Sequence, residues 1–186
     1  MRGLIDRMAP ARGLLVFCLL WLGVAAADPR PPGQAVASAH PEATAAGIAV
    51  LELGGNAFDA AVAVSAALAV VEPYSSGLGG GGFWLLHRAR DGFEVMIDGR
   101  ERAPLRATRD MYLDANGEPV PGASIDGPLA AGIPGEPAAL VHIARRYGRL
   151  PLALALAPAI HLARSGFVVD EHYRRMARWR LEALRA

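Results

Sequence analysis

The sequence predicts an α+β fold, in which helices come first, a pair of strands follows and further helices complete the chain. Three observations support this order. Residues 41–71 contain two apolar segments with helical start and stop signals, residues 83–98 contain the short runs and alternation of strands, and residues 137–184 return to helical patterns. With 186 residues, the chain is long enough for one domain with a substantial core.

Two helices are expected at the start of the folded part. The first covers residues 41–53, with proline in its first turn and a Gly-Gly pair as its stop signal. The second covers residues 57–71, where Asn56 can cap the helix and Asp59 stands three residues later, as in a capping box. The second helix is apolar on nearly all sides, which predicts burial on most of its faces.

Strand patterns follow the second helix. Residues 83–86 form a short apolar run between turn signals, which predicts a buried strand. An Asp-Gly pair at positions 91–92 indicates a tight hairpin turn. Residues 93–98 then alternate between apolar and other side chains, as expected for a strand with one buried face. A further short strand is expected at residues 129–133.

Three more helices are predicted in the last third of the chain. The first covers residues 137–147 and ends at a glycine. The second covers residues 150–163, and Pro158 should kink or split it because proline lacks the backbone N–H that a helix interior needs. The third covers residues 171–184, is rich in arginine and can be capped by Asp170.

The first 27 residues have the pattern of a secretory signal peptide. Three arginines precede a fourteen-residue apolar run that ends in Ala25-Ala26-Ala27. The run is shorter than the roughly 20 residues that a membrane-spanning helix needs, and an uncleaved anchor is the alternative. We therefore expect cleavage after Ala27, leaving residues 28–186 as a periplasmic or secreted chain without a stable membrane span. N-terminal sequencing of exported protein should begin at Asp28, and a sequence beginning at Met1 would contradict the expectation.

Composition excludes several classes of function for residues 28–186. Cys18, the only cysteine, lies in the leader, so disulfides, thiol nucleophiles and cysteine zinc sites are not available. The net charge of the whole chain is +1, with no basic patch that would indicate a nucleic-acid partner. The five histidines show no metal-ligand spacing and are interpreted as structural or exposed.

A glycine-rich stretch, SSGLGGGGFW, occupies residues 75–84. Gly77, Gly79 and Gly82 match the spacing G-x-G-x-x-G of dinucleotide-binding proteins, but that motif requires a strand before the glycines and a helix after them. Here a helix precedes and a strand follows, and no Gly-Lys-Ser/Thr sequence follows to form a phosphate-binding loop. The glycines are better explained by positive φ angles or by close approach of another backbone.

Arg100 stands where the second predicted strand ends. Its guanidinium can bind a carboxylate through two parallel hydrogen bonds, although an isolated arginine is more often a solvated or ion-paired surface group. Glu94 and Asp98 share one face of the same strand, but nothing else in the sequence supports a glycosidase-type acid pair. Ser75 and Ser76 lack the G-x-S-x-G pattern of a nucleophilic serine.

Taken together, several segments resemble a known family. The stretches SAHPEATAAGIAVLELGGNAFDAAVAVSAALAVVEPYSSGLGGGGFWLLH, DGRERAP, GPLAAGIPGEPAAL and LAPAIHLARSGFVVD are similar to the N-terminal part of the large subunit of the γ-glutamyltransferases. The resemblance covers residues 36–170. It implies a partial N-terminal-nucleophile hydrolase fold, an αββα sandwich that is incomplete in this chain.

The resemblance also implies an activity and a partner. Family members cut themselves into a large and a small subunit, and the new N-terminal threonine of the small subunit attacks γ-glutamyl amides such as glutathione. The glutamyl group then passes to water, amino acids or peptides, without a cofactor. The small subunit of the same precursor is therefore the expected partner.

Arg100 matches the family arginine that holds the α-carboxylate of the glutamyl group, and Glu101 is interpreted as an orienting or structural neighbour. The only threonines, Thr44 and Thr108, do not stand in the family's processing context, so no catalytic residue is expected in this chain. The sequence is therefore interpreted as a fragment, inactive by itself. The alternative is a secreted non-catalytic protein that binds a partner or is a decayed remnant; a downstream frame encoding a threonine-led small subunit would distinguish the two.

Overall fold

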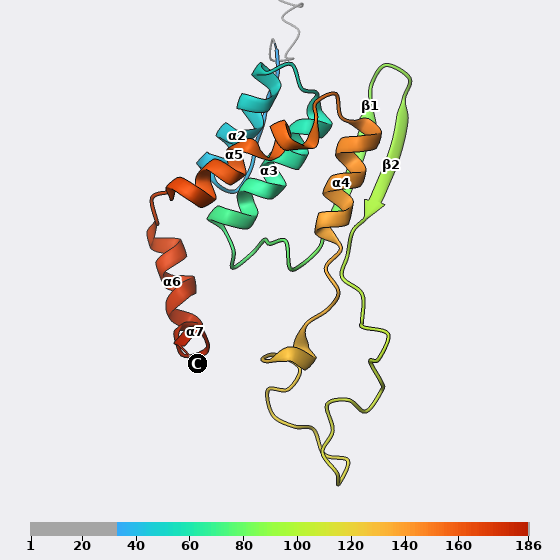
Figure 1. Ribbon diagram of the computed structural model, residues 1–186, viewed down its shortest axis with the longest axis vertical. Helices are drawn as coiled ribbons and strands as arrows, with labels where there is room; N and C mark the ends of the chain where they lie inside the picture. Colours follow the sequence, from blue (N-terminus) through green and yellow to red (C-terminus); the bar gives the residue numbers. More distant parts are fainter. Residues whose placement is uncertain (1–32, 186) are drawn as a thin grey trace, which may run out of the picture. The chain divides into compact units, whose positions relative to one another are not determined.

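The computed structural model describes residues 33–185, and the predicted signal peptide, residues 1–27, lies outside this range. All described elements belong to the compact unit Ala35–Ala186. Their order confirms the predicted succession of helices, strands and helices (Figure 1). The elements are α2 (Pro41–Glu52), α3 (Ala57–Val71), β1 (Phe83–Arg88), β2 (Phe93–Asp98), the 3₁₀ helix η1 (Pro128–Ala130), α4 (Glu136–Tyr147), α5 (Leu152–Ser165), α6 (Glu171–Trp179) and α7 (Leu181–Arg185).

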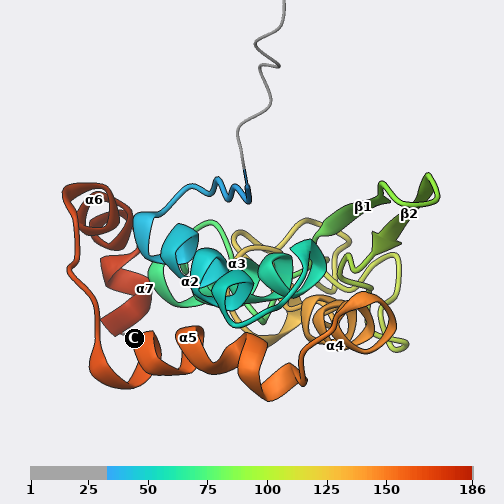
Figure 2. The same cartoon turned by 90° about the horizontal axis from the view of Figure 1, so that it is seen from above.

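Helix α3 is the central element of the unit. It contacts α2, α4 and α5, and Figures 1 and 2 show these helices around it. Most of its buried side chains are small, so that neighbouring helices can approach closely. The predicted burial on most faces is confirmed by residues from both halves of the helix: Asp59, Ala60, Val62, Ala63, Ala66, Ala67 and Val71.

Strands β1 and β2 form an antiparallel hairpin, paired from Phe83 opposite Asp98 to Arg88 opposite Phe93. The face with Trp84 and Val95 packs against the helical core, whereas the opposite face is exposed. The alternation predicted for the second strand is confirmed. The prediction that residues 83–86 form a buried strand is wrong, because the described residues cover only one face of this two-stranded sheet and only Leu86 is buried.

The start of α3 is joined to the turn between α4 and α5 by partly buried hydrogen bonds. The predicted capping box of Asn56 and Asp59 is present. Asp59 is fully buried, and its carboxylate also accepts the backbone N–H groups of Arg149 at 2.9 Å and Leu150 at 3.3 Å. The Asn56 side chain donates to the carbonyl oxygen of Tyr147 at 2.8 Å. Two residues that cap one helix locally therefore also fix a turn about 90 residues away.

The segment between β2 and α4 differs from the prediction. Residues 129–133 do not form a strand: Pro128–Ala130 is a 3₁₀ helix, and Ile133 makes only an isolated bridge with Arg102. Proline suits the start of such a helix because its φ angle is already fixed. A strand also needs a continuous partner, and only one residue pair is available here. Figure 1 shows the segment running away from the helices and returning to α4.

The later helices differ in part from the predictions. The predicted split at Pro158 does not occur, because α5 continues from Leu152 to Ser165, with Ala155 and Ala159 buried in the core, and the kink stays a prediction. The last predicted helix is interrupted at Arg180, which leaves the helical conformation and whose side chain pairs with Asp126. Within residues 33–185, no helix has the length and apolar character needed to cross a bilayer.

Candidate functional site

The glycine-rich loop meets two other backbone segments at the end of β2. Gly82 and Gly99 exchange both backbone hydrogen bonds, at 3.0 and 3.3 Å, and so extend the hairpin by one pair. The carbonyl oxygen of Gly80 accepts from the N–H groups of Gly135 and Glu136, the residues that begin α4. The loop therefore connects the end of β2 to the start of α4.

The close approach of backbone segments explains why glycines occupy this junction. A Cβ atom added to Gly81 would lie 2.2 Å from the carbonyl oxygen of Gly99, and one added to Gly135 would lie 2.2 Å from the same oxygen. A Cβ on Gly99 would lie 2.6 Å from the Trp84 ring. The predicted close backbone approach is confirmed. Positive φ is not the reason, because none of the glycines at positions 77–82 adopts it.

Arg100 is the residue directly after Gly99 of this junction. Its backbone N–H donates to the Asp98 carboxylate at 3.0 Å, which fixes the turn at the strand end. The Arg100 side chain is 70% exposed, and its nearest charged partner is Glu101, 4.0 Å from Nε. The guanidinium is therefore available for a ligand.

Two cavities have Arg100 in their walls. The larger, about 550 Å³, lies between the end of β2 and the start of α4 and includes Gly135 and His142. The smaller, about 370 Å³, lies beside the segment that follows Arg100 and includes Glu101 and Tyr112. A carboxylate bound in either cavity could pair with Arg100, and no strong ion pair of Arg100 would have to break.

Two acidic side chains lie near the junction. Glu136, the first residue of α4, is only 6% exposed. Burial, together with the negative charge of Glu101, holds the pKa of Glu136 above its ordinary value. Glu101 packs against the backbone of Gly80 and Gly132, where an added Cβ would lie 3.3 and 3.2 Å from its side chain. No pattern in the sequence predicts that Glu136 is buried.

The other candidates from the sequence lie apart from Arg100 or serve local structure. The Nδ1 atom of His40 caps α2, and His87 pairs with Glu94 at 2.9 Å on the hairpin. Glu94 and Asp98 thus have separate partners and form no acid pair. Among residues 33–185, no group of three or more potential ligands could hold a metal ion.

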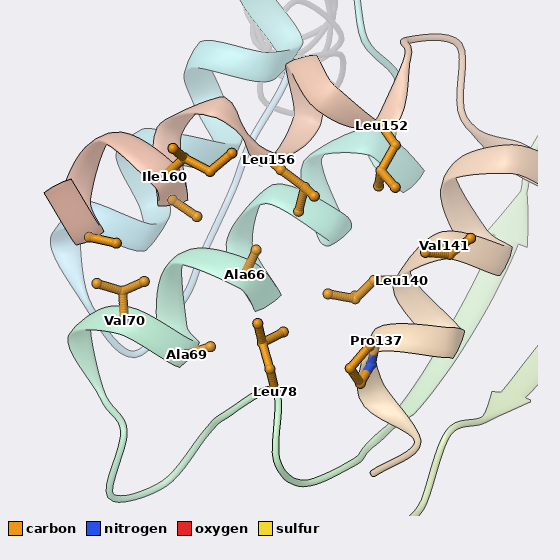
Figure 3. A pocket seen from close by; sticks show the side chains of 12 residues that line it. Ala66, Ala69, Val70, Leu78, Pro137, Leu140, Val141, Leu152, Leu156 and Ile160 are labelled. Atoms are coloured by element: carbon orange, nitrogen blue, oxygen red, sulfur yellow. The ribbon is translucent and has the colours of Figure 1, made fainter.

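A third cavity, of about 440 Å³, lies between α3, α4 and α5 (Figure 3). Leu78 of the glycine-rich loop projects into it beside Ala66 and Leu140, as Figure 3 shows. The residues around this cavity carry no charged side chain. It therefore lacks any group that could bind a carboxylate, and the site containing Arg100 is the stronger candidate.

Comparisons with known proteins identify the family to which the chain belongs. The family model described as gamma-glutamyltranspeptidase matches residues 43–186. The chain is 48% identical over 136 residues to the glutathione hydrolase proenzyme of Escherichia coli K12, covering 73% of this chain and 23% of that protein. It is 44% identical over 157 residues to the corresponding proenzyme of Pseudomonas sp. A14, covering 83% and 27%.

A solved structure is similar as well. The gamma-glutamyltranspeptidase of Helicobacter pylori matches with a TM-score of 0.77 and 43% sequence identity, over 83% of this chain and 44% of that chain. The chain spans about a quarter of the length of the curated relatives it matches. The match falls in the large-subunit region of these proenzymes.

Proposed function

Because the chain belongs to the gamma-glutamyltranspeptidase family, we propose that it supplies the N-terminal large-subunit portion of a secreted or periplasmic glutathione hydrolase. In the complete enzyme, this portion would help to bind γ-glutamyl compounds such as glutathione. The glutamyl group would be cleaved from its amide and transferred to water, an amino acid or a peptide. The small subunit of the same precursor would provide the nucleophilic threonine.

The observation that carries the proposal is the position of Arg100. The hairpin and the glycine junction fix its backbone, while its guanidinium remains exposed beside two cavities. Arginine has a planar, permanently charged fork that matches a carboxylate in two parallel hydrogen bonds. In the proposed function, Arg100 binds the α-carboxylate of the γ-glutamyl substrate and holds the scissile amide in a fixed direction.

The fold supports the same proposal. One face of the hairpin packs on helices, and the other exposes Phe83, Leu85 and Met96, which are 54%, 76% and 63% exposed. Exposed apolar side chains that share one sheet face favour contact with another layer. We propose that this face is the inner side of the αββα sandwich of an N-terminal-nucleophile hydrolase, completed by other parts of the enzyme.

The test uses a chimera, defined as the E. coli glutathione hydrolase proenzyme in which the matching region is replaced by that of this chain. Cleavage of a γ-glutamyl anilide by the chimera is the expected result. A chimera that folds and matures into two subunits but does not cleave the anilide would contradict the proposed function.

The 186-residue chain alone is expected to show no γ-glutamyl hydrolysis or transfer. Its threonines offer no activated nucleophile: Thr44 lies in α2 with its hydroxyl 2.8 Å from that of Ser38, and Thr108 lies exposed in the segment after β2. Neither has the adjacent α-amine that activates an N-terminal threonine. Release of anilide by the purified chain, abolished by Thr44→Ala or Thr108→Ala, would contradict this expectation.

A further inference from the structure

We propose that Gly81 and Gly135 are positioning residues for Arg100, because the backbones of both lie against the peptide group between Gly99 and Arg100. This inference rests on the proposed function, in which Arg100 binds the substrate's α-carboxylate. The two glycines are far apart in the sequence. Both would help to align the substrate, because without a side chain each can lie against the backbone of Arg100.

The geometry centres on one oxygen atom. Ideal Cβ atoms on Gly81 and Gly135 would each lie 2.2 Å from the carbonyl oxygen of Gly99. The Cβ on Gly81 would also lie 2.8 Å from the Cα of Arg100, and the Cβ on Gly135 would lie 2.7 Å from the Arg100 carbonyl oxygen. Both glycine backbones therefore lie directly against the backbone of Arg100 and the peptide that precedes it.

Hydrogen bonds hold the three segments in this arrangement. Gly82 pairs with Gly99, and Gly135 donates to Gly80 at 3.1 Å. Asp98 accepts the N–H of Arg100. The Arg100 backbone consequently has little freedom, and the only soft degrees of freedom left are the torsions of its exposed side chain. An arginine fork that starts from a fixed backbone loses less entropy when it binds a carboxylate.

An added methyl group should disturb this arrangement in a predictable way. A contact of 2.2 Å with a backbone oxygen is impossible, so the glycine's segment and the Arg100 peptide must move apart by about 1 Å to reach an allowed separation. Misplacement of a substrate-binding group by about 1 Å can reduce catalysis by about 100-fold. Gly79, in the same glycine run, has no atom within 4 Å of an added Cβ and serves as the matched control.

The test compares Gly81→Ala, Gly135→Ala and Gly79→Ala in the chimera, with two substrates: a γ-glutamyl anilide and an analogue that lacks the α-carboxylate. We expect Gly81→Ala and Gly135→Ala to raise KM for the glutamyl anilide at least about tenfold, with a smaller change in kcat. Gly79→Ala should stay within about twofold of the parent. For the analogue, all three variants should resemble the parent.

A double-mutant cycle separates positioning of Arg100 from a general structural role. In an Arg100→Ala background, the two glycine substitutions should change kcat/KM by less than about threefold, because the group that they misplace is absent. Equal losses in both backgrounds, or equal losses for both substrates, would overturn the inference. Failure of both variants to fold, while Gly79→Ala folds, would also overturn it, since the glycines would then serve the fold. If Arg100→Ala itself affected both substrates equally, the proposed carboxylate-binding role of Arg100 would fail, whatever the glycines do.

Discussion

Replacement of Arg100 by alanine in the chimera is expected to lower kcat/KM for a γ-glutamyl anilide by roughly two to three orders of magnitude. The bound α-carboxylate would lose its bidentate partner and remain as an unpaired charge in the substrate complex. Truncation of one member of a desolvated charge pair costs about 2–5 kcal/mol, and each tenfold change in rate corresponds to about 1.4 kcal/mol. Steady-state kinetics of the parent and the variant measure the effect directly.

Two controls make this prediction specific. Arg100→Lys should not restore activity, because lysine offers a point charge on a flexible chain and no fork. The loss caused by Arg100→Ala should largely vanish with an analogue that lacks the α-carboxylate, because that partner is then missing from both enzymes. An equal slowing of both substrates would instead make Arg100 a structural residue.

Asp59→Ala is expected to destabilise the chain by about 3 kcal/mol or more, because it removes the acceptor shared by three backbone N–H groups. The Asp59 carboxylate is fully buried and accepts backbone N–H groups from Asn56, Arg149 and Leu150. Alanine would leave these donors without an acceptor, and each buried unsatisfied donor costs about 1–3 kcal/mol. Thermal or urea unfolding of the 186-residue chain measures the change.

Asp114→Ala provides the matched control for Asp59. Asp114 also accepts backbone N–H groups, from Asn116 at 2.8 Å and Glu118 at 2.9 Å, and these bonds hold its pKa below the ordinary value. It is exposed, however, so water can replace the lost carboxylate. We expect a far smaller loss of stability than for Asp59→Ala. Similar small losses in the two variants would show that burial of the Asp59 network does not stabilise the fold.

Signals that act within a few residues of each other predicted most of the helices. The capping box of Asn56 and Asp59 and the first-turn prolines of α2 and α4 occur where the sequence indicates them. The Asp-Gly pair also lies in the hairpin turn, but the turn is longer than predicted, with residues 89–92 between the paired Arg88 and Phe93. These features depend on neighbours in the chain, so their patterns are complete in the sequence. The strand expected at residues 129–133 fails for the opposite reason: a strand needs a partner, and the apolar run alone does not supply one.

The features of the candidate site also fall into those that the sequence predicts and those that only the structure shows. The sequence by itself determined that Arg100 follows a strand, that the glycine run is not a dinucleotide loop, and that the chain resembles one enzyme family. Only the tertiary structure decided that Gly81 and Gly135 both lie against the Gly99 carbonyl, and that the Asp59 carboxylate accepts the backbone N–H of Arg149. The physical reason is distance along the chain. A glycine or a carboxylate can contact many different backbone segments that are distant in the sequence. Which segment it contacts depends on how the helices pack together.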